Sequence, residues 1–398
     1  MFKRNLLIII VMMLLITISG GQNLLAQDFT LDVDSAILID AKTGQILFEQ
    51  NADNKVPPAS ITKIMTLLVA IEKVENDELS LDDEFTVSNF ASSMQGSQLY
   101  LPAGAQLTLA DLFKAVSISS ANDASVALAE AVAGNYSSFI ELMNEKAEEL
   151  GMENTNFLNS SGYPEDRYPT VLPPGEHYST ARDIARMSRE LVKYDKILDW
   201  TSTWLRYLEL PEWNREIMVA NTNKLLQKYQ GLDGLRTGHT AAAGYCLSAT
   251  AKRDDVRLIS VILGAATDQD RQRLTTHLLD YGFNSFRKRE VIKQDEEIEN
   301  IIIPYGQQES TTVRAAENLE VLVKKGQPRA LETEIRIKSG LEAPVEKGEI
   351  VGEKVVIYEN QEVDSTDLIA TEDIKRVNIF VQLWRLFISW LTDLFDLI

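Results

Sequence analysis

The order of strand-like and helix-like segments constrains the fold of this chain more than any other feature. Apolar, β-branched runs predict strands at 35–40 and 45–49, and again at 244–252 and 256–264. Apolar residues at helical spacing predict helices after Ser60 and at 109–117, 124–133, 139–150, 181–193 and 271–286. We therefore expect one sheet whose strands come from distant parts of the sequence, with helices inserted between them.

Capping residues set the ends of several predicted helices. Thr108 precedes a helical segment, with Asp111 three residues later, and Thr180 precedes another, which are typical N-terminal caps. Gly134 and Gly151 follow the last apolar residues of two helices, where a residue with positive φ is favoured. These signals predict compact helices joined by short loops.

The composition changes after residue 288. Short strand-like segments at 299–303, 318–324, 332–338 and 354–358 are interrupted by Gly306, Gly326, Gly340 and Gly348. This pattern predicts a small β-rich accessory domain at 289–374, following a first domain at 27–288. The accessory region contains no group of side chains that suggests chemistry.

The last segment, 375–398, predicts an amphipathic helix. Apolar residues, two of them tryptophans, surround a polar stripe that recurs every three or four positions. Attachment to a membrane surface is the favoured interpretation, and docking on this chain or a partner is the alternative. Arg385, Asp393 and Asp396 argue against a membrane-spanning helix.

Residues 1–26 resemble a secretory signal peptide. Lys3 and Arg4 precede an apolar run at 6–18 and a stretch of small and polar residues, so cleavage after Ala26 is expected. An uncleaved anchor is the alternative, although the apolar run is short for a membrane span. Both interpretations place the protein outside the cytoplasm, and with the C-terminal helix they predict attachment to the outer face of the cytoplasmic membrane.

Charge and composition exclude several functions. The chain has 39 Lys and Arg residues against 59 Asp and Glu, a net charge of −20, which argues against nucleic-acid binding. Cys246 is the only cysteine, so no internal disulfide forms, and its apolar surroundings predict a buried, inert thiol. His177, His239 and His277 lack the spacing of metal ligands, so we expect neither a metal nor another cofactor.

The segment from Pro57 to Thr66 carries the first chemical motif. Pro57 and Pro58 fix an extended entry, and Ser60 and Lys63 then lie three residues apart near a helix start, on one face. A serine becomes nucleophilic when a neighbouring base takes its proton, and a lysine with a lowered pKa can be that base. Alone, the S-x-x-K spacing also fits an ordinary capping serine and a solvated lysine.

Two further motifs follow in the sequence. Ser120 and Asn122 form S-x-N just before a helix, where they also fit a simple capping cluster. Arg236, Thr237 and Gly238 then open a late strand, supplying a cation, a hydroxyl and a position where backbone approaches closely. This set suits the binding of a substrate carboxylate.

Together these motifs resemble the low-molecular-mass penicillin-binding proteins, specifically the serine-type D-alanyl-D-alanine carboxypeptidases. The resemblance covers nearly the whole chain after the signal segment and is strongest at 59–66, 109–134, 139–152, 177–187 and 233–253. It implies a β-lactamase/transpeptidase-like α+β catalytic domain, with an antiparallel sheet, helices on both faces and a helical insertion. The all-β domain and the amphipathic helix follow it.

The resemblance also implies a role for each motif residue. Ser60 attacks the D-Ala-D-Ala bond of a peptidoglycan stem pentapeptide and becomes the acyl-enzyme. Lys63 is the general base, Ser120 relays a proton, and Asn122 holds the substrate and Lys63. The remaining roles concern substrate binding. The backbone N–H groups of Ser60 and His239 form the oxyanion hole. Thr237, in the Thr237–Gly238 segment, binds the terminal carboxylate together with Arg236 and Arg271. β-Lactam antibiotics are expected as acylating inhibitors.

One motif departs from the family pattern. The family usually has Lys-Thr-Gly where this chain has Arg236-Thr237-Gly238, whereas the literal Lys42-Thr43-Gly44 precedes Ser60 in a predicted hairpin turn. Arginine keeps the positive charge but cannot shuttle a proton, so we expect an altered rate or penicillin affinity.

Two alternatives remain open. One is a catalytically weak or inactive relative that binds cell-wall peptide. The other is a β-lactamase, which would need a deacylating carboxylate in an E-x-x-L-N segment. Residues 155–185 contain Glu165, Asp166 and Glu176 but no such segment.

Overall fold

A computed structural model describes residues 30–164, 166, 168, 175–308, 310–326 and 331–395. The predicted signal peptide at 1–26 lies outside the described residues. The helices and strands that follow are those of the described ranges.

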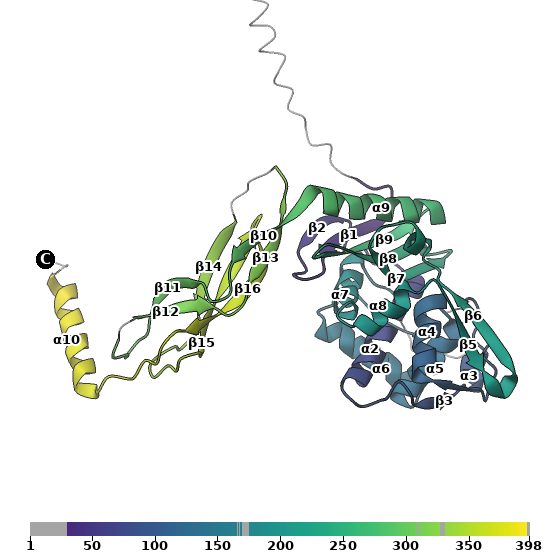
Figure 1. Ribbon diagram of the computed structural model, residues 1–398, viewed down its shortest axis with the longest axis horizontal. Coiled ribbons are helices and arrows are strands. Elements are labelled where there is room, and N and C mark those ends of the chain that lie inside the picture. Colours follow the sequence, from purple (N-terminus) through teal and green to yellow (C-terminus); the bar gives the residue numbers. More distant parts are fainter. Residues whose placement is uncertain are drawn as a thin grey trace, which may run out of the picture. The chain divides into compact units, whose positions relative to one another are not determined.

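The central sheet joins strands from both ends of the first region, as the sequence pattern predicts (Figure 1). It comprises β1 (Ser35–Asp40), β2 (Ile46–Gln50), β7 (Leu232–Thr240), β8 (Gly244–Arg253) and β9 (Val256–Ala265), in the order β2-β1-β9-β8-β7. All neighbouring pairs are antiparallel, and β1 pairs with β9 with Leu38 opposite Ser260. The Lys42-Thr43-Gly44 sequence lies in the turn between β1 and β2.

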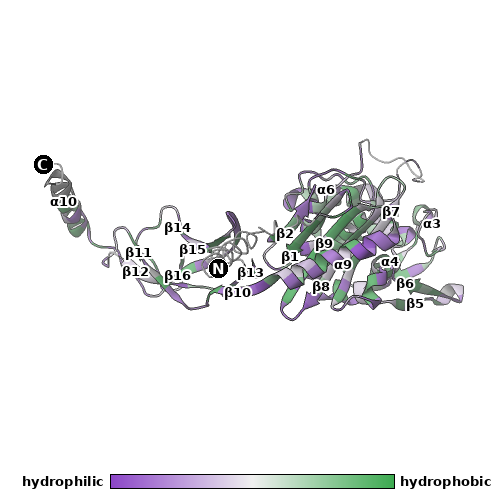
Figure 2. Ribbon diagram, turned by 90° about the horizontal axis from the view of Figure 1, so that it is seen from above, coloured by the Kyte–Doolittle hydropathy of each residue, from purple (hydrophilic) through white to green (hydrophobic). Residues whose placement is uncertain are grey.

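Helices cover both faces of this sheet, which confirms the predicted α+β fold. Helix α9 (Asp268–Ser285) packs on one face, and α7 (Ala181–Leu191) packs on the other (Figure 1). In Figure 2, apolar residues of the sheet lie beneath α9, whose visible side is largely hydrophilic. Strand β1, whose six residues are all buried, is therefore covered on both faces of the sheet.

The inserted helical region is built around α2 (Lys63–Glu75). Its first nine residues, from Lys63 to Ile71, are all buried, so this part of the helix lies inside the core. The other elements of this region are β3 (Glu84–Thr86), α3 (Asn89–Ser92), β4 (Gln106–Thr108), α4 (Leu109–Ser119), α5 (Asn122–Ala133), α6 (Tyr136–Glu149), α8 (Asp195–Ser202) and the 3₁₀ turn η4 (Lys224–Gln227). Because Lys63 occupies the first turn of α2, the packing of this helix holds Lys63 inside the core.

The capping predictions hold, whereas several helix starts were predicted too late. Thr108 and Thr180 accept hydrogen bonds from the backbone N–H groups of Asp111 and Asp183, and Gly134 ends α5 with φ of 74°. Helix α6 begins at Tyr136 and α9 at Asp268, three residues before their predicted starts, because polar first turns obscure the apolar period. The sequence did not predict the hairpin of β5 (Leu205–Leu210) and β6 (Arg215–Ala220), joined by η3 (Pro211–Trp213).

The later region is all-β, as predicted. Strands β10 (Phe286–Ile292) and β13 (Leu319–Lys324) form an antiparallel pair. A five-stranded sheet has the order β11-β12-β16-β15-β14 and comprises β11 (Glu297–Ile302), β12 (Ser310–Ala315), β14 (Glu332–Ile337), β15 (Ile350–Tyr358) and β16 (Gln361–Ala370). Buried side chains, mainly Val, Leu and Ile, form the hydrophobic clusters of this later region.

The last described element is α10 (Ile379–Phe395), within the predicted C-terminal helix. Phe380 is 79% exposed and Trp384 is 63% exposed, so large apolar side chains face solvent. Among the residues that the structure describes, no helix has the length and apolar content needed to cross a bilayer.

Candidate active site

The nucleophile candidate lies on a tight turn that leads into α2. Ala59–Thr62 form the 3₁₀ turn η1, and α2 begins at Lys63. One turn of helix separates Ser60 from Lys63, and Lys63 Nζ lies 3.0 Å from Ser60 Oγ. The spacing predicted from the sequence therefore places the two groups in hydrogen-bond contact.

Lys63 Nζ has two other partners, and both can only accept. It lies 2.8 Å from Asn122 Oδ1 and 2.8 Å from the Ser161 carbonyl oxygen. The orientation of the Asn122 amide is consistent, because its Nδ2 donates to the Gln95 carbonyl at 2.6 Å. A neutral amine gives its two hydrogens to these acceptors, which leaves its lone pair directed at the Ser60 hydroxyl.

The surroundings of Lys63 favour this neutral amine. The side chain is fully buried, and burial followed by the positive charge of Arg236 holds the pKa of Lys63 well below its usual value, against an opposing effect of Asp123. Asp123 is itself buried and its pKa is raised by burial, which its backbone hydrogen bonds from Leu99 and Leu101 partly offset. The site thus favours the deprotonated amine of Lys63, which is the form that is able to accept a proton.

Ser120 and Asn122 connect two helices at the edge of the same cleft. Ser120 ends α4 in the left-handed conformation, with φ of 61°, and Asn122 begins α5. The Ser120 hydroxyl is buried and has no hydrogen-bond partner among the described residues. An unpaired buried hydroxyl is costly unless a ligand completes it, so this group is available to a bound substrate.

Arg236 lies beneath the cleft and does not line it. Its side chain is 2% exposed, and Nη2 donates to the carbonyl oxygens of Val116 and Ser117 at the end of α4. Burial lowers the pKa of Arg236 to about 9, which still leaves it charged at neutral pH. The expectation that Arg236 contacts a substrate carboxylate is therefore revised, because its guanidinium is directed at the helix end.

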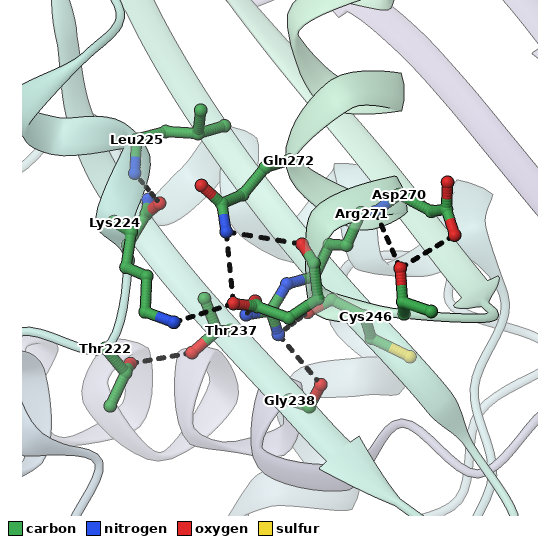
Figure 3. Close-up of polar contacts among 12 residues, drawn as sticks. Thr222, Lys224, Leu225, Thr237, Gly238, Cys246, Asp270, Arg271 and Gln272 are labelled. Carbon is green, nitrogen blue, oxygen red and sulfur yellow. Dashed lines mark hydrogen bonds and ion pairs between the residues drawn. The ribbon is translucent and has the colours of Figure 1, made fainter.

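The neighbouring residues of β7 do line the cleft. Figure 3 shows Thr237 donating to Thr222, at 2.6 Å between their hydroxyl oxygens. Gly238 passes so close to the η1 turn that a Cβ atom there would lie 3.1 Å from Ser60 N. His239 stacks on Tyr245, with ring centroids 4.0 Å apart. The strand thus runs alongside Ser60.

Arg271, from α9, borders the same hollow as Thr237 and Gly238. Figure 3 shows its guanidinium donating to the carbonyl oxygens of Gly238 and Cys246, at 3.3 and 3.2 Å. The guanidinium also forms an ion pair with Asp268. Asp268 also pairs with Lys224 at 2.8 Å. Cys246 is fully buried, and burial raises the pKa of its thiol to about 11, so the thiol stays protonated.

Two hollows meet at Ser60. One, of about 450 Å³, is lined by Ser120, Thr237 and Arg271, among others. The other, of about 730 Å³, extends past Pro57, Pro58 and Tyr163. Because Ser60 and His239 border both hollows, an extended ligand can pass over Ser60 with one end in each hollow.

Several residues of the site gave no signal in the sequence. Ser161 contributes a backbone carbonyl, which any residue type supplies, and Thr222, Lys224 and Asp268 lie far from the recognised motifs. His177 was considered only as a metal ligand, yet it borders the larger hollow. Across the described part of the chain, no group of three or more His, Cys, Asp or Glu side chains could hold a metal ion.

Comparisons with known proteins identify the family to which the chain belongs. The family model described as D-alanyl-D-alanine carboxypeptidase, peptidase S11, matches residues 22–267, and that of the penicillin-binding protein 5 C-terminal domain matches residues 286–376. D-alanyl-D-alanine carboxypeptidase DacF of Bacillus subtilis is 35% identical over 360 residues, covering 90% of each chain. DacC of Escherichia coli is 35% identical over 363 residues, covering 89% of this chain and 87% of that one.

Solved structures give the same result. Penicillin-binding protein 5 from Haemophilus influenzae superposes with a TM-score of 0.74 at 29% identity, covering 87% of this chain and 99% of that one. Penicillin-binding protein D2 from Listeria monocytogenes, in its ampicillin-bound form, has a TM-score of 0.55 at 32% identity, covering 64% of this chain and 99% of that one. The chain therefore belongs to the peptidase S11 family of serine D-alanyl-D-alanine carboxypeptidases, which are penicillin-binding proteins.

Proposed function

We propose that this protein removes the terminal D-alanine from peptidoglycan stem peptides through an acyl-enzyme on Ser60, with Lys63 as general base. The observation that carries the proposal is the environment of Lys63 Nζ, which lies 3.0 Å from Ser60 Oγ and 2.8 Å from two groups that only accept hydrogen bonds. This arrangement directs the lone pair of a neutral amine at the serine hydroxyl.

In the first step, Ser60 Oγ forms a bond to the carbonyl carbon of the D-Ala-D-Ala peptide bond while its proton passes to Lys63. The backbone N–H groups of Ser60 and His239 stabilise the oxyanion, an assignment supported by the close approach of β7 to the nucleophile turn. The C–N bond then breaks, and the departing amine takes a proton through Ser120. Asn122 keeps Lys63 in place throughout.

In the second step, a water molecule attacks the acyl-enzyme and gives a proton to Lys63. The Ser60 ester bond breaks, Ser60 recovers its proton, and the shortened peptide leaves. The same base thus serves both halves of the reaction, as microscopic reversibility requires.

The terminal carboxylate of the substrate would be bound on the Thr237 side of the cleft. Thr237 supplies a hydroxyl, and Arg271 supplies a positive charge. Asp268 is shared between Arg271 and Lys224, so these three side chains together carry one net positive charge. Lys224, more than half exposed at the cleft border, adds a second cation. Arg236 acts instead through its positive charge, which helps to lower the pKa of Lys63.

The same site would be acylated by β-lactams, with ring opening in place of loss of D-alanine. A β-lactamase reading requires a deacylating carboxylate near the acyl bond, and the larger hollow is bordered by Asp166 alone among the described acidic residues. We therefore expect a long-lived penicilloyl adduct. Rapid penicillin turnover would contradict this expectation.

We further propose that residues 27–288 form the catalytic domain, 289–374 the accessory domain and 375–398 a membrane-attaching helix. The exposed apolar side chains of α10 support attachment. Together with the signal-like segment at 1–26, they favour a location on the outer face of the cytoplasmic membrane.

The experiment that tests the proposal measures D-alanine release from a soluble peptide ending in D-Ala-D-Ala. We expect release by the parent protein and none by Ser60→Ala at equal folded concentration. A folded parent that binds the peptide without releasing D-alanine would contradict the proposal and would identify a cell-wall-binding relative instead.

A further inference from the structure

We propose that His177 is a positioning residue that holds the nucleophile turn through Thr62. The proposal rests on the assignment of Ser60 as nucleophile made above. His177 lies more than a hundred residues after that turn, yet its Nε2 is 2.8 Å from Thr62 Oγ1, within the 3₁₀ turn that carries Ser60.

The direction of each hydrogen bond follows from the groups involved. The backbone N–H of Leu158 lies 3.1 Å from His177 Nδ1 and can only donate, so Nδ1 accepts. Nε2 of the neutral ring therefore carries the hydrogen and donates to Thr62 Oγ1. The Thr62 hydroxyl in turn donates to the Ala59 carbonyl oxygen at 2.8 Å. A continuous relay of oriented hydrogen bonds thus runs from Leu158 to the residue before Ser60.

Burial keeps the ring in this state. His177 is 8% exposed, and burial lowers its pKa to about 3, so the ring stays neutral at neutral and mildly acidic pH. Phe157 packs edge-on against the imidazole, with ring centroids 5.7 Å apart. A neutral ring with a fixed tautomer can orient Thr62, whereas it is poorly suited to exchange protons during catalysis.

The η1 turn, which carries Ser60, has a backbone conformation that depends on support from its surroundings. Ala59 has φ of 49°, a left-handed conformation that an alanine seldom adopts, and it is buried. Its carbonyl oxygen packs against Gly162, where a Cβ atom would lie 1.7 Å away. Because the surroundings determine this conformation, removing the hydrogen bond at Ala59 would let the turn relax.

Relaxation of the turn would affect catalysis directly. Ser60 must keep its Oγ near Lys63 Nζ while its backbone N–H faces the developing oxyanion, and both depend on the backbone at Ala59. His177 therefore contributes to acylation without touching the reacting atoms. Misplacing a reacting group by about 1 Å commonly costs about a hundred-fold in rate.

The test compares His177→Phe, Thr62→Val and the double variant, with Thr62→Ser as the conservative rescue. His277→Phe, on the exposed side of α9, is the matched control for the His-to-Phe change. Each protein is assayed for acylation by a fluorescent penicillin, for kcat and KM of D-alanine release, and for Tm at each pH used.

We expect His177→Phe and Thr62→Val each to slow acylation by about ten- to a hundred-fold, mainly in kcat. The double variant should be no slower than Thr62→Val, because His177 acts through that hydroxyl. Thr62→Ser, which keeps the hydroxyl, and His277→Phe should stay near the parent rate. The pH profile of kcat/KM should keep its shape in every variant.

Three results would overturn the proposal. Full acylation rates in folded His177→Phe and Thr62→Val would show that the turn needs no such support. Additive losses in the double variant would show that His177 does not act through Thr62. Loss of a limb of the pH profile in His177→Phe would show that His177 exchanges a proton.

If His177→Phe does not fold, Thr62→Val and Thr62→Ser decide the outcome. A parent that releases no D-alanine would instead overturn the proposed function, and with it this one.

Discussion

At the scale of single residues, the proposed chemistry depends on one amine. Lys63 is fully buried and holds three hydrogen-bond contacts, two of them to groups that only accept. This geometry is productive only when the amine is neutral before attack. The predictions at this scale therefore concern the protonation of Lys63 and of the two ionisable residues that support the site.

Lys63→Arg should abolish general-base catalysis, because an arginine side chain stays protonated. We expect acylation by penicillin and D-alanine release to fall by about 10² to 10⁴-fold. Lys114→Arg is the control, since Lys114 pairs only with Asp111 on α4 in the described structure and should tolerate the change. A Lys63→Arg protein with parent-like acylation would contradict the assignment of Lys63 as base.

Arg236→Gln should move the acid limb of the pH profile. Burial is the larger cause of the lowered pKa of Lys63, and the charge of Arg236 is the second. Activity is lost as pH falls through this pKa, because the base becomes protonated. Removing the cation raises the pKa, so the acid limb of kcat/KM should move to higher pH.

Arg236→Lys distinguishes the effect of the positive charge at position 236 from the effect of the shape of the guanidinium group. It keeps the positive charge, so its acid limb should stay near that of the parent while kcat changes through the altered contacts with α4. An acid limb in the same place for parent, Arg236→Gln and Arg236→Lys would mean that the Arg236 charge does not reach Lys63.

Burial of neutral His177 should make stability depend on pH. Its pKa is about 3 in the folded protein and near 6.5 when unfolded, so the unfolded chain binds the extra proton at acidic pH. The contribution is present above about pH 6.5 and is lost towards pH 3, at up to about 1.4 kcal/mol per pH unit. The difference in unfolding free energy between parent and His177→Phe should therefore shrink on acidification. A constant difference would indicate a ring that does not titrate.

At the scale of helices and strands, α4 links fold and site. Thr108 caps its first turn, and its last residues lead into Ser120 and accept the hydrogen bonds of Arg236. A cation at a helix C-terminus is favourable because the last carbonyls are otherwise unpaired. Both ends of α4 are thus fixed by specific side chains.

Thr108→Ala should lower stability by about 1 kcal/mol, because the N–H of Asp111 loses its partner. Thr108→Ser keeps the cap and should remain close to the parent. Denaturant unfolding would measure both. Equal stability of Thr108→Ala and parent would show that solvent replaces the cap without cost. The site lies at the other end of α4, so D-alanine release at low temperature should change little.

Local patterns explain why so much of the fold was predictable. Caps such as Thr108 and Thr180 act within one helical turn, and the β8–β9 hairpin is defined by neighbouring residues, so the sequence alone indicated them. The S-x-x-K spacing is local in the same way. In contrast, the contact of Ser161 with Lys63 and that of His177 with Thr62 join residues about a hundred positions apart.

Two further features could not be predicted for a different reason. The β5–β6 hairpin carries exposed apolar residues such as Tyr207 and Met218, which obscure the alternation expected of a strand. The direction of the Arg236 side chain depends on where α4 ends in space, which no pattern around residue 236 encodes. Motif spacing thus identified the residue but not its partner.

At the scale of the whole molecule, the negative net charge opposes binding to an anionic membrane, whereas the exposed apolar side chains of α10 favour binding to a bilayer. The net charge of −20 disfavours approach to an anionic lipid surface, and the predicted removal of Lys3 and Arg4 makes it −22. Attachment through α10 must therefore rest on apolar burial, since each aromatic side chain that enters the interface removes a large apolar area from water. Binding should then need no anionic lipid.

Phe380→Asp combined with Trp384→Asp should abolish this attachment. The two side chains are 79% and 63% exposed and contribute much of the apolar surface of α10. We expect the full-length parent to sediment with zwitterionic vesicles with little dependence on salt, and the double variant to stay in the supernatant. Asn378→Asp adds charge at the start of the helix without removing apolar surface, so it should still bind. D-alanine release from a soluble peptide should be equal in all three proteins, because no described residue of α10 borders either hollow at Ser60. A parent that stays in the supernatant would indicate that α10 docks on protein, and equal sedimentation of all three would show that Phe380 and Trp384 do not carry the attachment.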